Sequence, residues 1–234
     1  LKIIHTYGVV KQAEELAGRM HLSVEDTDLA RLIALLHDIG RFEQLKRYDS
    51  FEPGTMDHAA YGVKVLFDEG MIRRFLPDDK WDSIIYTAIA HHSDYELPEI
   101  SDPQTLLHAK LIRDEDKLDN CRVKLVDSTN TFINVSEEEL GTQNITQKVY
   151  ETVFENKCIL SADRVTQMDY WVSYIVYFFD INFKESFDII AENDYLNRII
   201  DRIPYSNPVT KEQMENIRVY MQNFINSHTN SQSF

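Results

Sequence analysis

The chain has 234 residues, 43% of them hydrophobic, and can therefore bury a sizeable core, which excludes a wholly disordered protein. Its 39 acidic and 24 basic residues give a formal net charge of −15. A nucleic-acid polymer is not an expected partner, because such binding depends on Lys and Arg side chains that neutralise phosphates. The longest apolar stretch, residues 170–183, is shorter than the about 20 residues of a membrane-spanning helix, so no membrane partner is expected. Two cysteines and no recognisable signal peptide predict a cytoplasmic location.

Helical periodicity dominates the N-terminal half of the chain. Apolar residues at helical spacing predict a helix over residues 1–19, and Ser23 is the predicted N-cap of a second helix that ends near Asp38. Gly40 is expected to have a positive φ just past the end of that helix. The charged and aromatic segment 41–56 is predicted to form a loop. Three more helices are predicted over residues 57–69, 77–93 and 103–119.

The C-terminal half is predicted to be helical as well. The pattern is weak over residues 122–145, where Ser136 indicates one helix start. Longer helices are predicted over residues 161–181, 184–202 and 209–228. Together with the low content of seven Gly and six Pro, these patterns predict an all-α protein. We expect residues 1–120 to form a helical core and residues 121–234 to add helices packed on it, within one structural domain.

Seven residues with metal-ligating side chains lie on or beside predicted helix ends. The adjacent pair His37-Asp38 closes an apolar stretch, and buried charge is costly unless it is paired or bound to a metal. The candidates are separated by 21 to 33 residues, about the length of one helix and a loop, so successive helices can each bring a ligand to a common centre. The seven candidate metal ligands are His5, His37, Asp38, His58, His91, His92 and Asp116.

Several of these residues also have a structural interpretation. Asp116 lies in an acidic run of the kind that usually forms a solvated face, and His92 could be a cation at a helix C-terminus. Adjacent side chains on a helix point about 100° apart. We therefore expect one of His91 and His92 to bind a metal directly and the other to lie outside it or to face the substrate. His21 and His108 are assigned structural roles.

The order of these residues resembles a known family signature. His5, the pair His37-Asp38 and Asp116 are similar to the H…HD…D pattern of the HD-domain superfamily of metal-dependent phosphohydrolases. The additional histidines resemble the binuclear members, including the HD-GYP cyclic-dinucleotide phosphodiesterases, although no Gly-Tyr-Pro triplet follows here. The resemblance extends over residues 1–120 and is carried by the segments Leu35–Arg41, Asp57–Gly62 and Arg113–Asp119.

The resemblance implies a set of ligands for two divalent metal ions. Asp38 would bridge the two ions. Sequence alone does not distinguish Mn, Fe, Co, Mg, Ni and Zn. The first ion would be held by His5, His37, Asp38 and Asp116, and the second by Asp38, His58, His91 and His92.

The resemblance also implies an enzyme, a phosphomonoesterase or phosphodiesterase that cleaves a small phosphate ester, with nucleotides among the candidates. Asp38 would act through the bridged ions and their activated hydroxide, and Arg41 and Lys117 would stabilise charge on the phosphoryl oxygens. A basic island after the His-Asp pair would bind the substrate phosphate, and it consists of Arg41, Lys46 and Arg47. The general base is left open among Glu43, Glu52 and Asp57.

Two other functions use the same residues. The ligand set also resembles the mixed-valence di-iron HD oxygenases, such as myo-inositol oxygenase, which would act on a small polar substrate. The second alternative is a non-catalytic, metal-stabilised module that senses a ligand or contacts a protein. Oxygen uptake would favour the first alternative, and metal binding without any turnover would favour the second. The sequence leaves the oligomeric state open.

Overall fold

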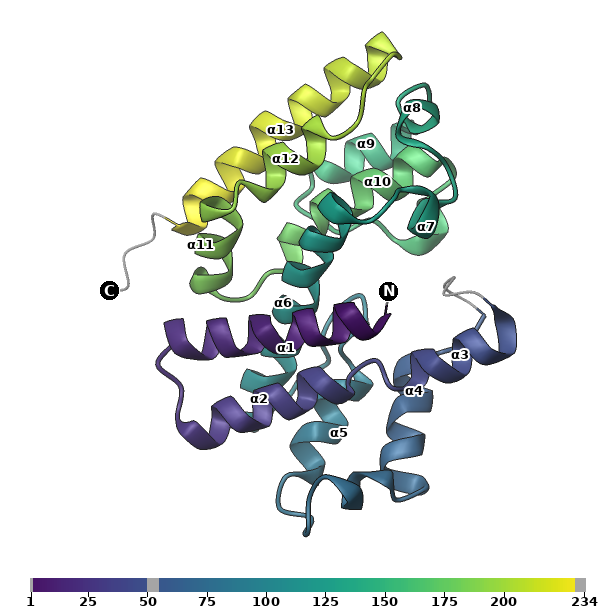
Figure 1. Cartoon of the computed structure of the whole chain (residues 1–234). Coiled ribbons are helices and arrows are strands. Elements are labelled where there is room, and N and C mark those ends of the chain that lie inside the picture. Colours follow the sequence, from purple (N-terminus) through teal and green to yellow (C-terminus); the bar gives the residue numbers. More distant parts are fainter. Residues whose placement is uncertain (1, 50–54, 230–234) are drawn as a thin grey trace. The chain divides into compact units, whose positions relative to one another are not determined.

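The computed structural model describes residues 2–49 and 55–229, and within them the protein is helical and contains no strand, as predicted (Figure 1). The chain forms two compact units, Leu1–Asp116 and Lys117–Phe234. Helix α6 (Pro103–Val126) contributes to both units and extends seven residues beyond the helix end predicted at residue 119. No helix in the described part is long and apolar enough to cross a membrane.

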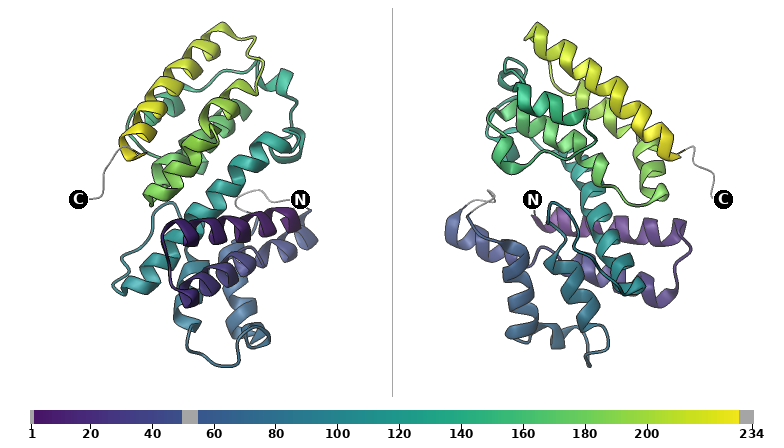
Figure 2. Two further views of the ribbon diagram at one scale, coloured as in Figure 1. Left: turned by 60° about the vertical axis from the view of Figure 1, so that its left-hand side comes forward. Right: turned by 180° about the vertical axis from the view of Figure 1, so that it is seen from behind.

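In the N-terminal unit, α1 (Lys2–Arg19) packs along α2 (Val24–Leu36), as Figures 1 and 2 show. Their apolar stripes face each other, and side chains such as Leu16 and Ile33 are fully buried. Each such burial contributes about 1.5–3 kcal/mol. The Ser23 hydroxyl accepts a hydrogen bond from the Asp26 amide at 3.0 Å, so the predicted N-cap of α2 is confirmed.

The remaining helices of this unit are α3 (Gly40–Tyr48), α4 (His58–Val63) and α5 (Asp82–Ala90). A π-helical turn, Lys64–Asp68, follows α4 directly. The loop predicted over residues 41–56 was therefore wrong where α3 lies. Within α3 only Gly40 and Gln44 are buried, so the helix has no apolar stripe by which its sequence could be recognised.

The role predicted for Gly40 was also wrong. Among the described glycines the positive φ belongs to Gly70, not to Gly40. Gly40 instead lies where α3 touches α4. A Cβ atom at this position would overlap the carbonyl oxygen of His58 and would lie 2.9 Å from the Gly62 nitrogen. The missing side chain therefore permits a close approach of two helices beside the His-Asp pair.

The C-terminal unit is built around buried aromatic and aliphatic side chains such as Trp171 and Phe178. The helix predicted over 184–202 is divided in two, because Asp194 has a left-handed φ of 51°. The buried carboxylate of Asp169 accepts hydrogen bonds from the backbone amides of Thr146, Val165 and Thr166 at the start of α10 (Gln167–Ile175). Besides the end of α6, the helices are α7 (Asn130–Ile133), α8 (Glu137–Leu140), α9 (Gln147–Val153), α10 (Gln167–Ile175), α11 (Lys184–Glu192), α12 (Tyr195–Asp201) and α13 (Pro208–Thr229).

Candidate metal centre

Six of the seven predicted ligands lie together in the N-terminal unit. Five of them form two groups that share His37, and in each group one donor atom from every residue lies within 4.8 Å of the others. The first group is His5, His37 and Asp116, and the second is His37, Asp38 and His92. His58 adjoins the second group, because its Nε2 is 3.1 Å from Nε2 of His92. Figure 1 shows the elements that contribute these residues: α1, the turn after α2, α4, the turn after α5, and α6.

Two of the histidines are oriented by the helices that precede them. His37 Nδ1 is 2.7 Å from the carbonyl oxygen of Ala34, and His92 Nδ1 is 2.7 Å from that of Ile89. The last carbonyls of a helix lack partners within it, so each accepts the Nδ1–H of the histidine three residues later. This fixes the tautomer and leaves the Nε2 lone pair facing the cluster, an arrangement typical of metal-binding histidines.

The donor atoms fit a metal. Nε2 of His37 is buried and has no hydrogen-bond partner, which is costly for a polar atom unless an ion or water binds it. The separation of 3.1 Å between the Nε2 atoms of His58 and His92 suits two nitrogens that bind one ion at about 2.0–2.1 Å. Imidazole nitrogens and carboxylate oxygens together are accepted by several divalent metals.

The protonation states also suit metal binding, because ligands must be deprotonated. Burial lowers the pKa of His37 to about 4 and lowers the pKa of His58 as well, so both imidazoles are neutral at pH 7. Burial alone would raise the pKa of Asp38, but the ammonium of Lys2 and the ring of His37 outweigh it and hold this pKa well below its usual range. Burial of Asp116 is likewise outweighed by His5, whose Nε2 lies 3.0 Å from Asp116 Oδ1, and its pKa is lowered.

The two carboxylate oxygens of Asp38 face different groups. Oδ2 lies 3.8 Å from His5 Nε2 and 3.6 Å from His37 Nε2. Oδ1 lies 3.5 Å from His58 Nε2 and 3.8 Å from His92 Nε2. The carboxylate therefore stands between the two sets of histidines, with one oxygen toward each.

His91 is placed differently from the other predicted ligands. Its Nδ1 is 2.6 Å from Asp94 Oδ2, its side chain is about one-third exposed, and it belongs to neither group in the described part of the chain. Of the two adjacent histidines, the structure brings His92 into the cluster.

The predicted phosphate-binding residues are distributed over three places. Arg41 lies at the cluster, with Nε 3.5 Å from Asp38 Oδ1. Lys46 is mostly exposed, and Arg47 pairs with Glu43 at 2.7 Å. Lys117 belongs to the C-terminal unit, where its Nζ is 2.6 Å from an Asp180 carboxylate oxygen. The roles of these residues toward a substrate stay predictions.

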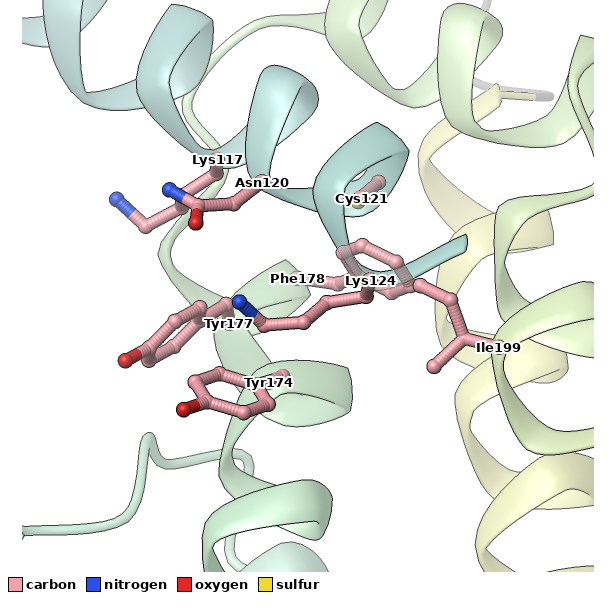
Figure 3. A pocket seen from close by; sticks show the side chains of 8 residues that line it. All are labelled: Lys117, Asn120, Cys121, Lys124, Tyr174, Tyr177, Phe178 and Ile199. Atoms are coloured by element: carbon pink, nitrogen blue, oxygen red, sulfur yellow. The ribbon is translucent and has the colours of Figure 1, made fainter. Parts of the chain in front are cut away.

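Lys117 also lines a small cavity in the C-terminal unit, beside Asn120 and near Lys124 and Tyr177 (Figure 3). The ammonium of Lys124 lies 4.0 Å from the centroid of the Tyr174 ring, a cation–π contact. The cavity volume of about 10 Å³ is about the space for one water molecule. It is therefore too small for a phosphate ester.

The candidates for a general base are not singled out by the structure. Glu43 pairs with Arg47, whose hydrogen bond lowers the pKa of this carboxyl group. Asp57 is the N-cap of α4 and accepts the Ala60 amide at 2.9 Å. Glu52 lies outside the described residues.

Lys2 is a further residue of the centre that the sequence motifs did not indicate, and its ammonium is 2.7 Å from Asp38 Oδ2. The available signal was its position one helical turn before His5, which places both residues on the same face of α1. Lys2 and Arg41 thus bring positive charge to opposite oxygens of the same carboxylate. This pairing supports an ionised Asp38 in the buried cluster.

The comparisons with known proteins agree with this geometry. The family model described as HD domain matches residues 3–121, just over half of the chain and a segment that includes all seven predicted ligands. No curated protein and no solved structure matches the chain.

Proposed function

The chain belongs to the HD-domain family, a superfamily of metal-dependent hydrolases, and we propose that it hydrolyses a small phosphate ester with the help of two divalent metal ions. The observation that carries this proposal is the position of Asp38. One of its oxygens faces His5 and His37 and the other faces His58 and His92. A carboxylate between two sets of nitrogen donors suits two ions better than one, because each oxygen can bind a different ion.

The chain's own residues would hold the ions and the substrate. His5, His37 and Asp116 would bind one ion, and His58 and His92 the other. Bound at such a site, two divalent ions lower the pKa of a water molecule and stabilise the attacking and leaving oxygens of a phosphate ester. Neutral imidazoles and two carboxylates would leave a site charge of about +2 with both ions present, which attracts a phosphate in an otherwise acidic protein.

Arg41 is the residue best placed to bind a phosphoryl oxygen. Its Nη1 donates to Gln44 Oε1 at 2.8 Å, and Nε2 of Gln44 donates to Thr55 Oγ1 at 2.8 Å. Gln44 is fully buried, so this chain of hydrogen bonds orients the guanidinium beside Asp38. The planar fork of an Arg matches the spacing of phosphate oxygens. The site therefore supports a small anionic substrate in preference to a neutral one.

Phosphate release by metal-stripped protein reloaded with Mn²⁺, Co²⁺ or Fe²⁺ tests the proposal. The panel contains mononucleotides, cyclic nucleotides and simple phosphomonoesters. Asp38→Ala should abolish both metal binding and turnover, whereas Asp28→Ala, a mostly exposed carboxylate on α2, should retain both. Hydrolysis that persists in Asp38→Ala would contradict the proposal.

The remaining outcomes separate the alternatives. Two bound metals without hydrolysis, but with oxygen consumed by the partly reduced iron form, would identify an HD oxygenase. Two bound metals without hydrolysis or oxygen uptake would identify a metal-stabilised sensor or interaction module.

A further inference from the structure

Arg113, on α6, has a buried guanidinium that contacts the turn carrying His92. Its Nη1 donates to the carbonyl oxygens of His91 at 3.0 Å and Asp94 at 2.7 Å, with that of His92 at 3.4 Å. Its Nη2 lies 3.5 Å from the Tyr95 carbonyl oxygen. Four carbonyl groups of one short turn therefore converge on a single side chain that is 2% exposed.

Physical chemistry explains why an arginine suits this place. The last carbonyls of a helix have no partners within it and carry the negative end of the helix dipole. Helix α5 ends at Ala90 with His91 as its C-cap, so the carbonyl groups of the turn that follows also lack partners within a helix. A guanidinium offers five donors in a fixed planar fork and stays charged at all relevant pH values. Arg113 thus donates to several carbonyl groups at once, and their dipoles offset the cost of burying its charge.

The turn is also held by its own groups, among them the contact of 2.6 Å between His91 Nδ1 and Asp94 Oδ2. Its backbone hydrogen bonds run from the His91 amide to the Thr87 carbonyl at 3.2 Å and from the Asp94 amide to the His91 carbonyl at 3.3 Å. The ring of His92 is oriented by the Ile89 carbonyl, but its Cα atom moves with the turn. A shift of the turn would therefore carry His92 away from His58.

We propose that Arg113 is a positioning residue for His92, and that it determines the affinity of the metal site formed by His58 and His92. This inference rests on the proposed two-metal function. Arg113 and Asp116 lie three residues apart on α6, so one turn of this helix supplies a ligand to one site and supports a ligand of the other. Groups that orient a ligand typically contribute about 10- to 100-fold to metal affinity. A merely structural role would instead lower stability and weaken both sites alike.

The experiment titrates metal-stripped protein with Mn²⁺ and measures the unfolding of the metal-free form. Arg113→Lys keeps the charge but places its donors on one atom, so it cannot reach four carbonyls. We expect one site with wild-type affinity and a second site weakened about 10- to 100-fold. Arg113→Met should weaken the site of His58 and His92 more than Arg113→Lys does. If the Met variant does not fold, the affinities of Arg113→Lys alone test the inference.

Arg202→Met is the matched control. Arg202 also contacts backbone carbonyls, those of Lys124 and Asp127 at the end of α6, but within the C-terminal unit. The variant Arg202→Met should lower the stability of the protein and leave both metal affinities unchanged. Equal weakening of both sites in Arg113→Lys, or no weakening of either, would overturn the inference.

Amide hydrogen exchange of residues 91–95 in the metal-free protein keeps the two proposals distinguishable. We expect faster exchange in Arg113→Lys than in the wild type, and unchanged exchange would overturn the role of Arg113 whatever the metal count. Wild-type protein that binds a single metal would overturn the two-metal function, and the exchange result would then decide whether Arg113 fixes the turn.

Discussion

Gly40→Ala is the sharpest test of how the centre is built. The added methyl group would overlap the His58 carbonyl oxygen and would lie 2.9 Å from the Gly62 nitrogen, whereas ordinary van der Waals contacts of a Cβ atom are at 3.4–4 Å. Both neighbours are backbone atoms, so no side-chain rotation relieves the contact. The His58 backbone must move by about 1 Å relative to α3, well beyond the about 0.2 Å within which metal–ligand distances are normally held.

The expected cost follows from this geometry. Overpacking typically destabilises a protein by about 1–3 kcal/mol. Because the added methyl group meets backbone atoms, the free energy of unfolding of Gly40→Ala should fall by an amount at the upper end of this range, about 3 kcal/mol. Because His58 moves with its carbonyl group, the site that it forms with His92 should lose its metal, while the site of His5, His37 and Asp116 should keep one.

Denaturant unfolding of the metal-free protein and metal titration measure the two effects. Gly18→Ala is the control, because a Cβ atom there has no neighbour within 4 Å, and it lies in α1. Replacing this helical Gly should stabilise the protein by about 0.5–1 kcal/mol and leave both metals bound. If Gly40→Ala were as stable as the wild type and bound two metals, the close approach would not be what positions His58.

In the metal-stripped protein, the contribution of His37 to stability should be lost as the pH falls from about 6.5 to about 4. Burial lowers the pKa of His37 to about 4, so the unfolded chain, with the ordinary value of 6.5, binds more protons in this range. The loss is on the order of 3 kcal/mol and is complete near pH 4. The free energy of unfolding, measured with denaturant across this range, should depend markedly less on pH in His37→Gln than in the wild type. In metal titrations, His92→Ala should bind one metal fewer than the wild type, whereas His91→Ala should bind as many, because of these two histidines only His92 belongs to a group in the described part of the chain. Loss of a metal in His91→Ala but not in His92→Ala would contradict the assignment. Asp169→Ala should lower the free energy of unfolding by about 2–4 kcal/mol, because the amides of Thr146, Val165 and Thr166 lose a buried charged acceptor, and metal binding should be retained in the same titration.

The helices that deliver the centre were predictable because they bury regular apolar stripes. The helix over residues 1–19 and the Ser23 cap followed from periodicity and side-chain chemistry, both of which are local. Helix α3 was not predictable in this way, because it buries only Gly40 and Gln44. Likewise, the reason for Gly40 lies in a helix that begins 18 residues later in the sequence, and no local pattern records that contact.

The centre itself was predictable as a set of residue types at helix ends, but not in its side-chain detail. Apolar periodicity could not choose between His91 and His92, since Ala88 and Ile89, three residues before each, are both fully buried. The choice depends on how the chain turns after Ala90, and that turn is held by Arg113, 21 residues away from His92. Lys2 is similarly 36 residues from the carboxylate that it contacts. Which residue types gather in such a centre is therefore local information, whereas their positions depend on cations such as Arg113 and Lys2, whose partners only the tertiary structure brings together.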